Sequence, residues 1–361
     1  MRFLFVVQGE GRGHMTQAIA LSEMLRRNNH EVVKALVGSS GMRKIPAFFS
    51  EQICVPIQTY ASPNFLKTKD NKRFRIFNSI VYNLKRKNRK AYFDSIRLIN
   101  KSIDEIKPDI VVNFYELLVG LAYRRYKIQT PMICVAHQFV FEHSEYKFTH
   151  QLNPTQRMLR IYTSLCSLNA RKRVALSFVP MAGDTGKRLV VAPPLLRREI
   201  VDLPVSAQPY WLGYILNHGF SEEIITWHSQ HPEMVIHVFW DHPDALETYQ
   251  PHPNLSFHQL NDKLFIDMMA HCSAFFGTAG FESICESLFL NKPTMIVPAH
   301  AEQQLNAMDA KQSGKVSVAS SFDLDRLKDA VQCHNPEDTG FRDWVKQSER
   351  IWLREICITE S

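Results

Sequence analysis

One histidine and one set of polar residues stand at spacings that suit a general base and a phosphate-binding site. His14 closes the stretch GEGRGH and so follows a glycine-rich turn. A histidine with a pKa near neutrality can take a proton from an attacking hydroxyl group. Far along the chain, Gly280, Ser283 and Glu286 recur at intervals of three residues. This interval places side chains on one face of a helix.

The stretch FFGTAGFESICESLFLN is typical of a strand, a glycine-rich turn and a helix, and it predicts a phosphate site. The backbone N–H groups of Thr278, Ala279 and Gly280, with the positive end of the helix, would face the phosphate. The Ser283 hydroxyl lies in the first helical turn and would reach a phosphate oxygen. The Glu286 carboxylate would accept hydrogen bonds from both hydroxyls of a ribose.

Two further polar residues extend this predicted site. Glu302 and Gln303 stand at the start of the next expected helix, where they would hold the hydroxyls of a sugar. The alternative is an ordinary core helix in which Ser283 is a cap and Glu286 is solvated, but the whole run of residues favours the binding site. The Asp-x-Asp pattern at residues 323–325 is typical of a capped helix start, so we expect no metal site there.

The first glycine stretch fits neither of the common phosphate motifs. A dinucleotide fingerprint needs G-x-G-x-x-G, whereas the third glycine comes one residue early here, and EVVKALVG ends without an acid. No Gly-Lys-Ser/Thr follows, which excludes a Walker A loop. The turn therefore delivers His14 to the carboxyl edge of a sheet. We assign Gly11 and Gly13 to ligand binding, since small residues let a substrate approach His14; a histidine that only caps the helix is the alternative.

Strands alternate with helices along both halves of the sequence. This order predicts α/β folding with doubly wound parallel sheets. We expect one Rossmann-like domain over residues 1–200 and a second over 201–340, joined by the proline-rich stretch VVAPPLLRREIVDLPVSAQP and separated by a cleft. Residues 341–361 predict one amphipathic helix that packs back on the N-terminal domain.

Composition excludes several classes of protein. With 45% hydrophobic and 22% charged residues, the chain should form substantial cores and is not disordered. The seven cysteines are scattered without a CxxC pair, which argues against a zinc site or a disulfide framework and predicts a cytoplasmic protein. No run of 18 apolar residues occurs, so no membrane-spanning helix is expected.

The net charge of +7 is unevenly distributed. Residues 67–90 carry basic side chains against a single acid, Asp70, and large apolar residues interrupt them. This pattern suits an anionic membrane surface, because each nearby lysine or arginine contributes about 1 kcal/mol. The alternatives are the solvated face of a core helix and, less favoured, a nucleic-acid surface. The basic residues are Lys67, Lys69, Lys72, Arg73, Arg75, Lys85, Arg86, Lys87, Arg89 and Lys90.

The pattern G-x-x-S-x-x-E, followed by K-P and then by E-Q…N-A, resembles the donor-nucleotide signature of glycosyltransferases of the GT-B fold. It is similar to the signature of plant and animal UDP-glycosyltransferases, of the peptidoglycan N-acetylglucosaminyltransferase MurG and of the monogalactosyldiacylglycerol synthases. GEGRGHMTQA resembles the glycine-rich loop of the same families. The motifs cover about 60 residues, and the order of strands and helices extends the similarity over most of the chain.

The resemblance implies roles for individual residues. Gly280 and Ser283 would contact the diphosphate, Glu286 the ribose, and Glu302 and Gln303 the donor sugar. His14 would be the base that deprotonates the acceptor. GT-B enzymes generally need no bound metal or other cofactor, so the nucleotide-diphosphate sugar is expected as a substrate.

Two departures from the family pattern bear on these roles. The plant relatives carry a histidine at the diphosphate where this chain has Thr278. Their base is often backed by an aspartate, and here NFYELL offers Asn113 and Glu116, of which Glu116 would orient His14. His137, at the end of another expected strand, is the rival base; otherwise it is a hydrogen-bonded loop histidine.

The sequence therefore predicts a cytoplasmic GT-B glycosyltransferase that uses a nucleotide-diphosphate sugar, UDP-linked by the resemblance. The basic aromatic segment falls in the half that handles the acceptor in GT-B enzymes, which favours a lipid-linked or cell-envelope glycan acceptor. A UDP-sugar 2-epimerase of the same fold is one alternative, although further catalytic carboxylates are not evident. A non-catalytic nucleotide- or glycan-binding subunit is the other.

Overall fold

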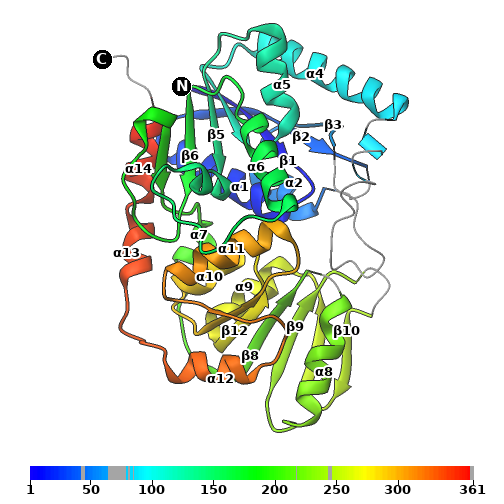
Figure 1. The fold of residues 1–361 in the computed structure, drawn as a ribbon, viewed down its shortest axis with the longest axis vertical. Helices are drawn as coiled ribbons and strands as arrows, with labels where there is room; N and C mark the ends of the chain where they lie inside the picture. Colours follow the sequence, from blue (N-terminus) through cyan, green and yellow to red (C-terminus); the bar gives the residue numbers. More distant parts are fainter. Residues whose placement is uncertain are drawn as a thin grey trace. The chain divides into compact units, whose positions relative to one another are not determined.

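A computed structural model describes residues 1–41, 45–63, 79, 82–83, 85–216, 218–242 and 246–357 (Figure 1). The chain divides into two compact units. Unit 1 comprises Met1–Leu66, Arg75–Arg197 and Trp344–Ser361, and unit 2 comprises Lys67–Phe74 and Arg198–Asp343. Each unit is built on its own seven-stranded sheet flanked by helices. The expected α/β class with two Rossmann-like units is confirmed.

The sheet of unit 1 is parallel throughout, in the order β3-β2-β1-β4-β5-β6-β7. Its strands are β1 (Arg2–Gln8), β2 (Glu31–Ser39), β3 (Ile57–Ala61), β4 (Ile110–Phe114), β5 (Met132–Ala136), β6 (Lys172–Leu176) and β7 (Leu189–Ala192). The strand order reverses between β1 and β4, and open α/β sheets bind ligands at the carboxyl ends of the strands at such a point. Residues that follow β1 and β4 are therefore the first candidates for a site.

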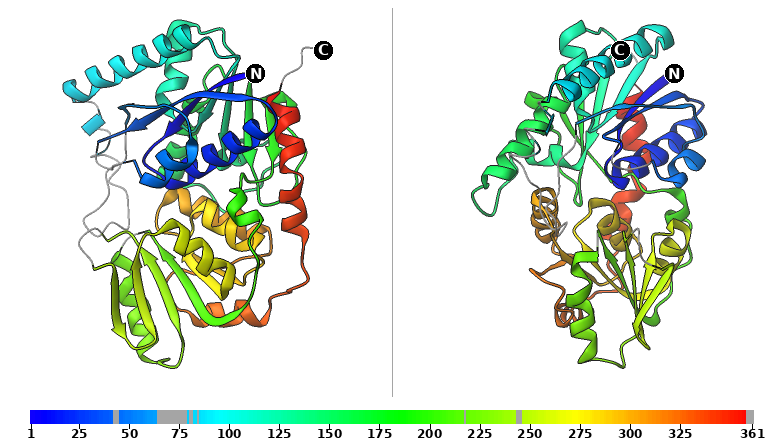
Figure 2. Two further views of the ribbon diagram at one scale, coloured as in Figure 1. Left: turned by 180° about the vertical axis from the view of Figure 1, so that it is seen from behind. Right: turned by 90° about the vertical axis from the view of Figure 1, so that its right-hand side faces the viewer.

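The helices of unit 1 follow its strands in sequence. They are α1 (Arg12–Arg27), α2 (Ala47–Ile53), α4 (Arg86–Ile106), α5 (Leu117–Tyr126) and α6 (Pro154–Cys166), with short 3-10 helices η1 (His137–Glu142) and η2 (Thr185–Lys187). A capping box between Asn153 and Gln156, with Pro154 in the first turn, fixes the start of α6. Figure 2 shows these elements from two further sides.

The sheet of unit 2 has the order β10-β11-β9-β8-β12-β13-β14, and its edge strand β10 runs antiparallel to β11. The strands are β8 (Gln208–Ile215), β9 (Ile236–Trp240), β10 (Thr248–His252), β11 (Leu255–Gln259), β12 (Cys272–Thr278), β13 (Thr294–Val297) and β14 (Ser317–Val318). Here the order reverses between β8 and β12. The turn after β12 carries the second glycine stretch of the sequence.

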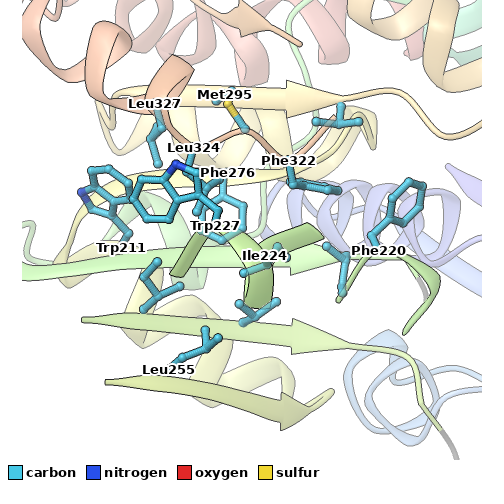
Figure 3. Packing of buried hydrophobic residues seen from close by; sticks show 14 of the residues in the cluster. Trp211, Phe220, Ile224, Trp227, Leu255, Phe276, Met295, Phe322, Leu324 and Leu327 are labelled. Atoms are coloured by element: carbon cyan, nitrogen blue, oxygen red, sulfur yellow. The ribbon is translucent and has the colours of Figure 1, made fainter. Parts of the chain in front are cut away.

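The helices of unit 2 pack on this sheet around an aromatic core. They are α7 (Arg198–Val201), η3 (His218–Phe220), α8 (Ser221–Ser229), α9 (Asp262–His271), α10 (Phe281–Phe289), α11 (Ala301–Gln312) and α12 (Asp325–Gln332). Trp211 from β8 stacks on Trp227 from α8 with ring centroids 5.8 Å apart, and Phe276, Phe322 and Leu327 complete this part of the core (Figure 3).

The last segment of the chain returns to unit 1. It forms two helices, α13 (Gly340–Lys346) and α14 (Ser348–Ile356), so the prediction of one continuous helix is wrong. The indole Nε1 of Trp344 donates to the Ser177 carbonyl at 3.0 Å, and that of Trp352 donates to the Pro193 carbonyl at 3.2 Å. These bonds attach the segment to the region of β6 and β7.

Two further regions bear on the sequence predictions. The proline-rich stretch expected as a linker contains the boundary between the two units, between Arg197 and Arg198, together with residues of β7 and the short α7. Of the basic segment, residues 67–75 lie outside the described residues, and Lys85 to Lys90 form the cap and first turns of α4. In the part of the chain that the structure describes, no helix is long and apolar enough to cross a membrane.

Candidate active site

The GEGRGH stretch joins β1 to α1 at the switch point of unit 1. Gly9 donates its N–H to the Gly38 carbonyl at 2.9 Å, and a Cβ at Gly9 would lie 2.5 Å from that oxygen. Only glycine therefore fits this close approach to β2. The Gln8 side chain accepts from the Gly11 N–H at 3.1 Å, and Gly13 lies in the first turn of α1.

His14 stands in the first turn of α1 and is half-buried. Its Nδ1 lies 3.4 Å from Oε1 of Gln17, and its ring stacks on that of Tyr115 with centroids 5.3 Å apart and planes 29° apart. Burial lowers the pKa of His14 to about 4, against the smaller opposing effect of the Gln17 hydrogen bond. The imidazole is therefore neutral at neutral pH and able to accept a proton.

Glu116 follows β4 and caps α5. Its Oε1 accepts from the Ser62 hydroxyl at 2.7 Å and from the Leu118 N–H at 3.1 Å. Its Oε2 is buried without a hydrogen-bond partner among the described residues and lies where a Cβ on Gly38 would stand. Burial raises the pKa of Glu116 to about 7.

Glu116 does not make the expected contact with His14. The hydrogen bonds of the Glu116 carboxylate go to Ser62 and Leu118, and the side chain that bonds His14 is Gln17. The expected contact of Glu116 with His14 is therefore wrong, and the side chain beside Nδ1 is that of Gln17, three residues after His14 on the same helix. With the Gln17 carboxamide oxygen as the acceptor in this contact, the tautomer that fits is the one with the proton on Nδ1 and the lone pair on Nε2.

The rival histidine has a different environment. His137 is only 1% exposed, and its Nδ1 donates to the Leu176 carbonyl at 2.8 Å. Its ring meets the rings of Phe141 and Phe178 edge-on, each with centroids 5.2 Å apart. Burial lowers the pKa of His137 to about 4 as well. Because His137 is enclosed and bonded to backbone, the half-buried His14 is the better candidate for a base that a substrate reaches.

The second glycine turn follows β12 at the switch point of unit 2. Two of the amides expected to face a phosphate are used internally: Ala279 donates to the Val297 carbonyl at 3.3 Å, and Gly280 donates to the Thr278 carbonyl at 2.7 Å. The expectation that these N–H groups bind an anion is therefore wrong for this conformation. The Thr278 hydroxyl is fully buried and has no partner within the described residues.

The helix that follows this turn has an uncapped start and an acidic residue, Glu282, in its first turn. Gly280 caps α10 without a side-chain hydrogen bond, so its first turn is not closed by a cap. The Ser283 hydroxyl donates to the Gly280 carbonyl at 3.1 Å. Ser283 and Glu286 are buried on α10 at 7% and 5% exposure. Their predicted contacts with a diphosphate and a ribose remain predictions.

The start of α11 lies next to the same turn. Glu302 and Gln303 are in its first turn, as expected from the sequence. Gln303 accepts from the Ala299 N–H at 2.9 Å and so closes the turn before the helix. Asn306 donates to the Ala279 carbonyl at 3.1 Å and thereby ties α11 to the turn after β12. The role of Asn306 was not predicted, although the E-Q…N-A pattern contained it.

The Asp-x-Asp pattern belongs to a helix start. Asp325 begins α12, its N–H donates to Asp323 at 3.2 Å, and its carboxylate pairs with Lys328 at 2.9 Å. Among the described residues, no group of three or more His, Cys, Asp or Glu side chains is arranged to hold a metal ion.

Comparison with solved structures supports the fold. The glycotransferase of kitacinnamycin superposes with a TM-score of 0.63 at 15% identity, covering 98% of each chain. UGT2 of Phytolacca americana, complexed with UDP-2fluoro-glucose and pterostilbene, gives 0.61 at 14% identity, covering 97% of this chain and 95% of that one. The spinosyn rhamnosyltransferase SpnG complexed with thymidine diphosphate gives 0.58 at 12%, covering 98% and 96%.

No curated protein matches the sequence closely enough to count as a relative. The family model described as glycosyl transferase family 1 matches residues 1–333. The GT-B architecture of two Rossmann-like units agrees with this match, and a closer kinship with MurG or the monogalactosyldiacylglycerol synthases stays a prediction. The chain belongs to glycosyl transferase family 1 and is a glycosyltransferase of the GT-B type.

Proposed function

We propose that this glycosyltransferase moves a sugar from a nucleotide-diphosphate sugar, UDP-linked, to a hydroxyl group of a lipid-linked or cell-envelope glycan at the cytoplasmic face of a membrane. The observation that carries the donor part is the helix start after β12, where Gly280 caps α10 without a side-chain bond and Ser283 and Glu286 follow on α10. Structures of similar fold were solved with UDP-2fluoro-glucose and with thymidine diphosphate.

The proposed reaction assigns one task to each unit. His14 in unit 1 accepts the proton of the acceptor hydroxyl as its oxygen bonds to the anomeric carbon of the sugar. The bond from that carbon to the diphosphate breaks, and the helix start of α10 stabilises the charge on the departing diphosphate. No metal is required in this scheme, so we expect turnover to survive treatment with EDTA.

Donor binding is tested with a panel of UDP- and TDP-sugars in a thermal shift assay, since a ligand that binds the folded state raises its melting temperature. Glu286→Ala should weaken UDP binding by about 1.5–3 kcal/mol through the loss of charged hydrogen bonds. Glu233→Ala is the matched control, because this exposed carboxylate precedes the amino end of β9, whereas α10 follows the carboxyl end of β12. Unchanged UDP affinity in Glu286→Ala would remove the ribose role.

Turnover separates the proposal from its alternatives. Transfer to a lipid-linked acceptor, or slow hydrolysis of the donor, is expected from the purified protein. Release of a 2-epimerised sugar would instead identify an epimerase, and UDP binding without turnover on any acceptor would identify a binding subunit.

The membrane part of the proposal rests on the start of α4. Lys85 caps this helix, and Arg86, Lys87, Arg89 and Lys90 in its first turns are exposed. No acidic residue lies in the first turn, so the positive charges stand at the positive end of the helix dipole. Positive charges at this end of the helix dipole disfavour the helix. An anionic surface outside the protein would attract these charges and offset that cost.

Exposed aromatic groups lie close to these charges. Phe93, further along α4, is 49% exposed, and the Arg125 guanidinium lies 6.0 Å from the centre of its ring. Tyr126 is 39% exposed on α5. A basic surface with exposed rings binds anionic bilayers through both charge and apolar burial.

Vesicle co-sedimentation tests the membrane proposal. Replacing Arg86, Lys87, Arg89 and Lys90 by glutamine should reduce binding to vesicles of anionic lipid, by about 1 kcal/mol for each charge. Phe93→Ser should weaken binding in high salt as well, because its contribution is apolar. Equal binding of the wild type to neutral and anionic vesicles would contradict the proposal.

A further inference from the structure

The backbone of Tyr115 has a conformation that its position does not explain. Its φ is 59°, in the left-handed region that a large side chain rarely occupies. Cys54, Lys107 and Lys127 also have positive φ, but each caps the end of a helix, where this conformation is ordinary. Tyr115 instead follows a strand and precedes the cap of α5. Such outliers persist only where the surroundings hold them, and they concentrate at functional sites.

Buried hydrogen bonds hold this turn in place. Asn113 accepts from the Glu116 N–H at 2.8 Å through its side-chain oxygen. Its amide group donates to the carbonyl of Cys166 at 2.8 Å and to that of Glu116 at 3.1 Å. The Cys166 thiol donates to the Tyr115 carbonyl at 3.6 Å. The end of β4 and the end of α6 thus fix the backbone of Tyr115 from both sides.

The Tyr115 side chain is fixed at its far end as well. Its hydroxyl lies 2.7 Å from the Thr163 hydroxyl, and the Thr163 hydroxyl donates to the Leu159 carbonyl at 2.9 Å. Tyr115 is therefore the donor to Thr163. The rings of Tyr162 and Phe139 lie 5.4 and 6.5 Å from its ring, and the side chain is only 4% exposed.

Tyr115 also contacts a predicted catalytic group: its ring stacks on that of His14, with planes 29° apart. We propose that Tyr115 is a positioning residue for His14, and that the left-handed conformation of Tyr115 between β4 and α5 holds its ring against the imidazole. Gln17 holds Nδ1 and Tyr115 holds the plane of the ring, so that Nε2 points in one direction. The inference rests on the proposed function, in which His14 takes the proton of the acceptor.

Tyr115→Gly tests this role, because glycine adopts a φ of 59° freely, so the backbone turn can persist while the ring and its hydroxyl bond to Thr163 are lost. We expect kcat to fall about 10–100-fold with donor affinity unchanged, the loss typical of a misplaced catalytic group. Tyr115→Phe keeps the stack and should retain most of the turnover. Lys127→Gly is the matched control. It likewise replaces a residue of positive φ by glycine, at the other end of α5, and should leave kcat unchanged.

Nuclear magnetic resonance gives a readout that needs no substrate. The Cε1 proton of His14, assigned by its loss in His14→Ala, should carry an upfield ring-current shift that disappears in Tyr115→Gly and persists in Tyr115→Phe. Loss of this shift would establish the stack in solution, and the fall in kcat at unchanged donor affinity would establish that the stack matters for turnover. If Tyr115→Gly does not fold, Tyr115→Asn serves, because asparagine tolerates the left-handed region.

The outcomes separate this inference from the proposed function. Full turnover in His14→Ala would show that the base is another group and would overturn both. Loss of turnover in His14→Ala, with an unchanged kcat and an unmoved His14 resonance in Tyr115→Gly, would overturn the role of Tyr115 alone.

Discussion

At the scale of single residues, the pKa of His14 sets the pH range in which it can act as a base. Burial lowers that pKa to about 4, below the ordinary value near 6.5. A base works only when unprotonated, so activity is present above the pKa and is lost as pH falls through it. We therefore expect the acidic limb of the kcat/KM profile to lie near pH 4–5, with turnover at pH 5.5 close to its value at pH 7.

The control for this profile is Glu116→Gln, since Glu116 also titrates within the range. If the limb belongs to His14, it should stay in place in Glu116→Gln. An acidic limb near pH 6.5 that persists in Glu116→Gln would mean that the imidazole is solvated during turnover, contrary to the structure.

Glu116 makes a separate prediction about stability. Burial raises its pKa from 4.5 to about 7, so the folded protein holds a proton there that the unfolded chain has lost. For a raised pKa, the stabilising effect is fully present below pH 4.5 and is lost as pH rises through 7. The shift corresponds to about 3 kcal/mol as an upper value. The free energy of unfolding of Glu116→Gln, relative to that of the wild type, should therefore be larger at pH 8 than at pH 5.

Urea unfolding of the two proteins at both pH values measures this gain. The glutamine oxygen can accept the same hydrogen bonds from Ser62 and Leu118. The cost of burying its amide group does not depend on pH, so it cancels when the difference between the two proteins at pH 5 is subtracted from that at pH 8. An equal difference in unfolding free energy at pH 5 and pH 8 would show that the carboxyl group does not change its ionisation on folding.

At the scale of secondary structure, the close approach of α5 to α6 depends on one glycine. A Cβ at Gly120 would lie 2.2 Å from the Leu165 carbonyl oxygen and 2.9 Å from that of Cys166, both backbone atoms of α6. Gly120→Ala should therefore lower the free energy of unfolding by about 1–3 kcal/mol through overpacking. Gly186→Ala is the control, because its nearest neighbour is a side-chain oxygen 3.5 Å away. Similar unfolding midpoints for both variants would contradict this packing.

The elements that the sequence predicted well are those with a strong local pattern. Residues 3–7, FLFVV, are apolar throughout because this part of β1 is buried on both faces, and the glycine turn after β1 placed His14 correctly at the start of α1. The four-residue strand β7 was missed because it lies in a proline-rich stretch. The break at Gln347 was missed because the apolar residues of α13 and α14 keep helical spacing across it.

The partners of the site residues were harder to predict than their positions. Gln17 could have been found, since it lies three residues after His14 on one helix face. The stack of Tyr115 on His14 depends on β1 and β4 being neighbours in the sheet, which no local pattern encodes. The internal use of the Ala279 and Gly280 amides likewise depends on the tertiary position of the Val297 carbonyl and on the local turn geometry.

At the scale of the whole molecule, the chain leaves unit 1 after Arg197 and returns to it at Trp344. Ion pairs join the returning segment to the rest of that unit, between Glu349 and Arg27 at 3.2 Å and between Glu355 and Lys172 at 2.8 Å. Partly exposed pairs of this kind contribute little to stability. The buried indole groups of α13 and α14 should contribute more.

Trp352 provides the test of this arrangement. Its side chain is fully buried in unit 1, and Trp352→Ala should lower the stability of that unit by about 3–5 kcal/mol. Trp227→Ala makes the same exchange in the core of unit 2 (Figure 3). Hydrogen exchange measured by mass spectrometry should show faster exchange in β6 and β7 for the first variant and in β8 and β9 for the second. Because residues 344–361 belong to unit 1, faster exchange confined to unit 2 in Trp352→Ala would contradict the division of the chain.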